Sequence, residues 1–253
     1  MRNLKKLLAA IVTVCMLATF AVPAFAEKSD ADICTDLGMI LGEGSGVTAE
    51  YLASQPYRLQ GAIMFLRLKG LEDEAKAFVV TEENFSDVDG LNETNKAILG
   101  YLKAHPELGF VGVGNNMFAP FKEMTAKEYY KVLLVALGYE EGVDFTWANL
   151  LQFAATKGLV KLLDNTAFTV NDLCVATVEA LKATVKGGDD NLITMLVEAG
   201  VIAADKAVAT GLYSGVPRAL QVVSASADNL KTAKIVFSKE LDKDTVNTEQ
   251  YRE

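Results

Sequence analysis

The feature that most constrains the fold is a unit that recurs, imperfectly, three times along the chain. Each unit reads as a helix, a glycine-rich loop and a second helix that begins at a capping residue. A helical pair of this size cannot bury its apolar faces alone, so stacked copies must complete one another's core. We therefore predict a mainly α-helical protein that presents a binding surface and has no enzyme pocket.

The clearest copy of the unit spans residues 80–141. Its first helix is predicted to end near Gly109, where further glycines allow a tight loop. Thr125 and Glu128 then have the spacing of a capping box, in which each side chain satisfies a free backbone amide at the start of a helix. This spacing predicts a second helix that ends at Gly138.

The other two copies are assigned to residues 27–79 and 142–188. The second helix of the earlier copy is predicted to stop at Gly70. In the later copy Thr169 is the predicted cap, and the helix that follows is predicted to run to Gly187-Gly188. All three copies therefore share one plan but differ in loop length.

The end of the chain follows another pattern. Residues 189–215 are predicted to form a capping helix and a linker, and residues 216–253 alternate as strands do. The segment Lys234–Asp242 resembles the start of an Ig-like domain of bacterial surface proteins. Because two strands alone are not a stable domain, we interpret the sequence as the N-terminal part of a longer protein. The alternative is that the hairpin packs on the helical body.

Residues 1–26 have the pattern of a secretory signal peptide. Basic residues precede an apolar run from Leu7 to Val22, and Ala24-Phe25-Ala26 is a small-x-small cleavage site. A membrane anchor is disfavoured because this run is shorter than the ~20 residues of a spanning helix. We predict export, a mature chain that starts near Glu27, and no membrane insertion after cleavage.

The mature chain is strongly acidic, because all 33 acidic residues but only 21 of the 24 basic ones lie beyond the signal, a net charge of −12. Such a chain repels nucleic acid, and an anionic wall polymer would need a local basic site. Cys34 and Cys174 are too few for a disulfide framework, although an oxidising compartment would permit one bridge. We expect two small buried thiols.

Several short segments carry a resemblance to the S-layer homology modules of bacterial surface proteins. Phe85-Ser86-Asp87-Val88 resembles the opening motif of that family, and Thr146-Trp147-Ala148 resembles its aromatic helix start. Three segments fall where the family has a Thr-Arg-Ala-Glu signature: Tyr57-Arg58-Leu59-Gln60, Thr125-Ala126-Lys127-Glu128 and Thr169-Val170-Asn171-Asp172. The resemblance covers about residues 30–185.

The resemblance implies three modules in a pseudo-threefold bundle that grips a secondary cell-wall polysaccharide, often one bearing a pyruvyl ketal. By this resemblance Arg58 would pair with the ligand's carboxylate, for which a planar guanidinium is suited. Asp87 and Trp147 would help to shape the sugar grooves. Ala126 and Val170 replace the arginine in the other two units, so one groove at most could hold an anionic sugar in this way.

Each candidate residue also has a plainer interpretation. Arg58 could be an exposed helix residue, Trp147 a core residue and Asp87 the cap of the helix that follows it. His105 is the only histidine, so neither a histidine-based metal site nor a catalytic triad is expected. We predict no catalytic residues, no metal and no cofactor.

The pattern as a whole predicts non-catalytic attachment of an exported S-layer or envelope protein to the cell wall of a bacterium. The partners would be a secondary cell-wall polysaccharide and, in a surface layer, further copies of the chain. One alternative is a self-assembly element that has lost polysaccharide binding. Another is the N-terminal module of a longer wall-associated enzyme.

Overall fold

The computed structural model of the chain describes residues 28–42, 44–215, 222–229 and 232–237. They divide into a helical unit that ends at Leu212 and a second unit that begins at Tyr213. The predicted signal peptide lies outside the described residues, as does much of the predicted Ig-like segment. The mainly α-helical class is confirmed.

The helical unit consists of short helices joined by loops that turn at left-handed glycines. In chain order the helices are α2 (Asp30–Asp36), α3 (Ala49–Ala53), α4 (Arg58–Lys69), α5 (Glu72–Ala77), α6 (Glu93–Ala104), the 3-10 helix η1 (Pro106–Leu108), α7 (Ala126–Ala136), α8 (Leu150–Thr156), α9 (Val170–Lys182), α10 (Leu192–Glu198) and α11 (Ala204–Ala209).

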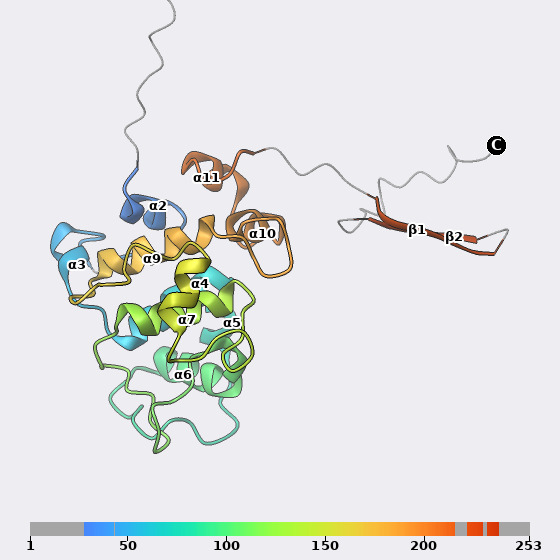
Figure 1. The fold of residues 1–253 in the computed structure, drawn as a ribbon. Coiled ribbons are helices and arrows are strands. Elements are labelled where there is room, and N and C mark those ends of the chain that lie inside the picture. Colours follow the sequence, from blue (N-terminus) through green and yellow to red (C-terminus); the bar gives the residue numbers. More distant parts are fainter. Residues whose placement is uncertain (1–27, 43, 216–221, 230–231, 238–253) are drawn as a thin grey trace, which may run out of the picture. The chain divides into compact units, whose positions relative to one another are not determined.

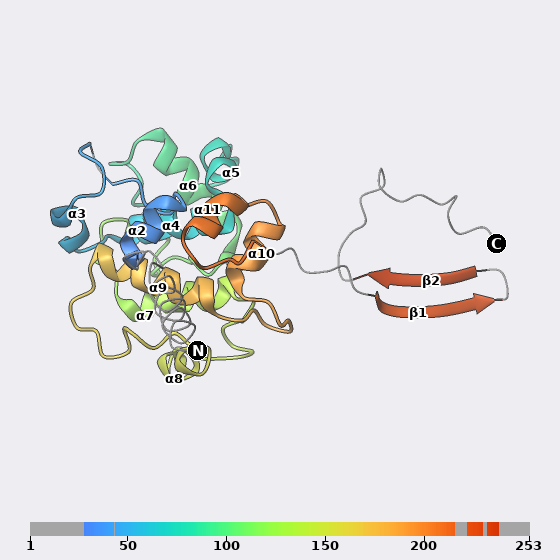
Figure 2. The same ribbon diagram turned by 90° about the horizontal axis from the view of Figure 1, so that it is seen from above.

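Helices α4, α7 and α9 form the middle of this unit (Figures 1 and 2). Helix α7 packs against α4, α8 and α9, while α9 also packs against α2, α3 and α10. The shared core is apolar and aromatic, with Phe65 and Phe110 in edge contact at 5.5 Å between ring centroids. Most of these helices therefore bury apolar residues against their neighbours, although α3 buries none.

The starts of α7 and α9 are capped as the sequence predicts. Thr125 accepts a hydrogen bond from the Glu128 N–H at 3.2 Å, and the Glu128 carboxylate accepts one from the Thr125 N–H at 3.0 Å. Thr169 and Asp172 make the same reciprocal pair at the start of α9. Both capping boxes satisfy amides that the helix itself leaves free.

The chain segments that lead into α4, α7 and α9 meet. The Arg58 N–H donates to the Lys122 carbonyl at 2.8 Å, which joins the start of α4 to the segment before α7. The Val170 N–H donates to the Ser54 carbonyl at 2.9 Å, which joins the start of α9 to the segment before α4. Three of the longest helices in the described part of the chain thus begin close to one another.

Two details differ from the prediction. Helix α9 ends at Lys182, and Ala183 is already extended, so the helix does not reach Gly187-Gly188. Thr184 instead forms an isolated β-bridge with Asn191, the N-cap of α10. The short helices α3 and α5 were not predicted, because five or six residues carry too little periodicity to be recognised.

The second unit contains two strands, β1 (Val222–Asn229) and β2 (Thr232–Phe237), paired antiparallel. Ala227 lies opposite Ala233 in the register. A two-stranded ladder does not test an Ig-like domain, so that assignment remains a prediction.

Candidate ligand-binding grooves

Arg58 is an internal residue of the helical unit. It is only 9% exposed, and its Nη2 donates to the Val111 carbonyl at 2.7 Å. The guanidinium carbon lies 4.9 Å from the ring centroid of Phe118 and 5.5 Å from that of Phe110. The interpretation of Arg58 as an exposed helix residue is therefore wrong, because aromatic rings and a carbonyl enclose it.

The charge of Arg58 is compensated within the protein. Its Nη1 lies 4.0 Å from Oε1 of Glu128, which also accepts from Lys122 Nζ at 2.6 Å. Burial lowers the pKa of Arg58, and the Glu128 carboxylate opposes that effect; an arginine nonetheless stays charged at neutral pH. Its Nε is buried without a hydrogen-bond partner among the described residues.

Asp87 holds a loop and does not cap a helix. Its two carboxylate oxygens accept from the N–H groups of Phe118 and Ala119 at 2.9 and 2.7 Å. Ala119 has a φ of 59°, a strained value for alanine that these contacts help to maintain. The cap of α6 is Asn92, so the helix-capping interpretation of Asp87 is wrong.

Trp147 lies on the surface. It is 46% exposed and precedes α8, which begins at Leu150. Lys127, in the first turn of α7, places its Nζ 4.4 Å from the centroid of the indole. The core interpretation of Trp147 is therefore wrong, and the predicted helix start at this tryptophan is three residues too early.

The structure does not gather the three predicted residues into one groove. Arg58 and Asp87 meet through Phe118, whose ring packs on the guanidinium and whose N–H binds the carboxylate. Trp147 makes its contact elsewhere, at Lys127. Arg58 and Asp87 thus brace the loop before α7, and the ligand roles of all three residues remain predictions.

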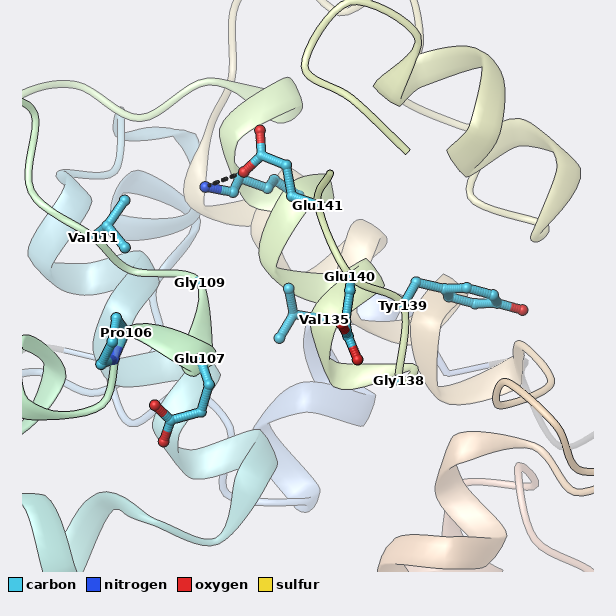
Figure 3. A pocket seen from close by; sticks show the side chains of 10 residues that line it. Pro106, Glu107, Gly109, Val111, Val135, Gly138, Tyr139, Glu140 and Glu141 are labelled. Carbon is cyan, nitrogen blue, oxygen red and sulfur yellow. Dashed lines mark ion pairs between the residues drawn. The ribbon is translucent and has the colours of Figure 1, made fainter. Parts of the chain in front are cut away.

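One groove of about 510 Å³ lies between the loop after α6 and the C-terminal half of α7 (Figure 3). We call it the α7 groove. Val111 and Glu107 stand on one side and Val135 and Glu140 on the other, while Lys131 pairs with Glu141 at 2.8 Å. The charged residues that line this groove are therefore three glutamates and Lys131, whose charge is neutralised by Glu141.

A wider groove of about 930 Å³ lies along α3 and the start of α4, and we call it the α3–α4 groove. Hydroxyl, amide and carboxylate groups line it: Ser45, Thr48, Glu50, Tyr51, Ser54, Gln55, Tyr57, Gln60 and Glu123. Tyr57 is 46% exposed and meets Phe121, 60% exposed, edge to face at 6.1 Å between centroids. Tyr57 lines this groove among the polar groups, and its ring contact joins the exposed Phe121 to it.

Sequence reasoning did not single out Tyr57 or Phe121. Tyr57 stands at the N-cap of α4, whereas the N-caps of α7 and α9 are threonines, and Phe121 follows a proline. An aromatic residue at an N-cap, where small polar residues are usual, is the one sequence signal that could have drawn attention to Tyr57. Their contact depends on the backbone bridge between Tyr57 and Glu123, which sequence alone does not reveal.

Comparison with known proteins gives no relative: no family model, no curated protein and no solved structure matches the chain. Within the described residues, no three histidine, cysteine, aspartate or glutamate side chains are grouped so as to hold a metal ion. Nor does that part of the chain contain a helix with the length and apolar character needed to cross a membrane.

Proposed function

We propose that this chain is a non-catalytic module that attaches an exported envelope protein to the bacterial cell wall by binding a secondary cell-wall polysaccharide. Its place would be the cell surface, after removal of residues 1–26. The proposal joins the export signal and the repeat pattern of the sequence to the α3–α4 groove of the structure.

The fold proposed with this function is a set of three related helix–loop–helix units. The pairs would be α2 with α4, α6 with α7, and α8 with α9. Their second helices begin at equivalent places in the pattern: Tyr57, Thr125 and Thr169 are the N-caps. The hydrogen bonds that join the segments before these helices support an approximate threefold arrangement.

The observation that carries the proposed function is the exposed pair Tyr57 and Phe121 beside a polar groove. A sugar ring has apolar C–H faces and a rim of hydroxyl groups, so it needs aromatic surface together with hydrogen-bond partners. Gln60, Glu50 and Ser54 supply such partners along the groove. Its volume of about 930 Å³ lies in the range of ligand pockets.

The charge of the groove favours an uncharged stretch of glycan. Glu50 and Glu123 are its charged lining residues, and carboxylates repel an anionic ligand. Arg58, which by family resemblance would bind a pyruvyl carboxylate, is occupied by Val111, Phe118 and Glu128. We therefore propose recognition through hydroxyl groups and ring faces.

Tyr57→Ala is expected to weaken binding to purified wall sacculi about tenfold, or roughly 1.4 kcal/mol, since one aromatic contact of a sugar face would be lost. The measurement is co-sedimentation of the full chain with sacculi over a range of salt concentrations. The matched control is Val143→Ala, which changes a 74% exposed residue that does not line the groove.

Two results would count against the proposal. If the chain does not co-sediment with sacculi under any ionic condition, the proposed attachment to wall polysaccharide is contradicted. Normal binding by a folded Tyr57→Ala variant would instead remove the α3–α4 groove as its site. If the protein formed ordered arrays without wall material, the self-assembly alternative would be favoured.

A further inference from the structure

Two cysteines that lie 140 residues apart in sequence meet in the core. Cys34 comes from α2 and Cys174 from α9, and both are fully buried. The Sγ of Cys34 lies 3.7 Å from the carbonyl oxygen of Cys174. Because α2 packs along α9, the two side chains are presented to each other from facing helices.

Both thiols are free and protected in the folded chain. Burial raises the pKa of Cys34, and its contact with the Cys174 side chain raises that pKa further. The thiolate is the reactive form of cysteine, so the Cys34 thiol reacts slowly in the folded chain, and full burial shields Cys174 from reagents. In the unfolded chain burial no longer protects either thiol, so both can react before the chain has folded.

We propose that Cys34 and Cys174 form an intramolecular disulfide when the chain folds in the presence of a small-molecule or protein disulfide. One thiolate attacks the reagent disulfide, forms a mixed disulfide and releases one reagent thiol. The second thiolate then attacks the mixed disulfide, closes the Cys34–Cys174 bond and releases the second reagent thiol. Two cysteine sulfurs are oxidised, the reagent is reduced to two thiols, and the two cysteine protons end on them.

The bond would fix the first helix of the described chain. Helix α2 has only seven residues and buries Ala31, Ile33 and Cys34, and it packs mainly against α9. The closed loop would run from α2 to α9 and restrict a long stretch of the unfolded chain, which is where a disulfide stabilises most. This inference is independent of the proposed polysaccharide binding.

The test uses the full chain with Cys15→Ala, so that only the two core cysteines remain. The protein is refolded in a mixture of oxidised and reduced glutathione and then compared with protein refolded under a reducing agent. We expect a product lighter by two hydrogen atoms, a Cys34–Cys174 cross-linked peptide after digestion, and a Tm higher by about 5–15 °C. If the cross-linked protein is unfolded, reduced and refolded under the reducing agent, its Tm should return to that of the reduced protein.

Cys34→Ala in the same background is the control, and its Tm should be the same in both buffers. The proposal is overturned if the refolded protein keeps both thiols free, carries glutathione on them, or links them between chains. It is also overturned if the cross-link forms but does not raise the Tm.

Discussion

Glu179→Ala is expected to destabilise the protein by about 3–5 kcal/mol, the largest effect of any single change considered. Glu179 lies in α9 and is 6% exposed. Its Oε2 accepts from the Tyr130 hydroxyl at 2.6 Å, and its Oε1 accepts from the N–H groups of Val160 and Lys161 at 2.9 and 2.8 Å. Alanine would leave three donors without their partner and a cavity beside them.

Urea unfolding, followed by circular dichroism, measures this loss. Glu179→Gln is the informative second variant: its carbonyl oxygen can still accept from the two N–H groups, so we expect a smaller loss of about 1–2 kcal/mol. Glu93→Ala is the matched control, because Glu93 is exposed and pairs only with Lys96 among the described residues; it should change stability by less than about 0.5 kcal/mol. If Glu179→Ala lowers the free energy of unfolding by less than about 1 kcal/mol, the hydrogen bonds described for Glu179 are contradicted.

Arg58→Ala is expected to lower the free energy of unfolding by about 2–4 kcal/mol. The change removes the hydrogen bond to the Val111 carbonyl and empties the space between the rings of Phe110 and Phe118. Arg58→Met keeps most of the side-chain volume and removes a buried charge whose Nε has no partner in the described structure. We expect this second variant to lose less stability than Arg58→Ala, because methionine refills the space between the two rings, although the Val111 carbonyl still loses its donor.

The same pair of variants separates a structural from a ligand-binding role of Arg58. Stability is measured by thermal unfolding, and polysaccharide binding is measured at a temperature where both variants are folded. If Arg58 acts only within the core, Arg58→Met binds wall polysaccharide as the unaltered chain does. Loss of binding in a fully stable Arg58→Met variant would show that the guanidinium contacts the ligand.

Local rules of sequence predicted much of the fold. The capping boxes at Thr125 and Thr169 were predictable because their partners lie three residues away. Gly70 and Gly138 were recognisable as helix ends because the left-handed backbone there, with φ of 70° and 88°, favours glycine. These features depend only on neighbouring residues, which is why one sequence was sufficient to place them.

The environment of the candidate site was not predictable in this way. Arg58 is enclosed by Phe110 and Phe118, which are more than fifty residues away in the chain. Nothing next to Arg58 indicates these partners, so its burial was missed. The prediction for Trp147 was wrong although it used only local sequence. The pattern around Trp147 suits one face of a helix, but the helix starts only at Leu150.

The local sequence around Glu179 carries one signal of its buried role. It is a carboxylate in the middle of an otherwise apolar stretch of α9, between Val178 and Ala180. A charged residue in such a run is buried only when it is paired. Its partners, Tyr130 and the amides of Val160 and Lys161, belong to other elements, and only the fold reveals them.

The most direct measurement is a calorimetric titration of the folded chain with solubilised wall polysaccharide, before and after its pyruvyl ketals are removed. We expect saturable binding of similar affinity to both preparations, weakened by Tyr57→Ala and retained in Arg58→Met. No heat of binding to either preparation, or binding that disappears with the ketals, would contradict it.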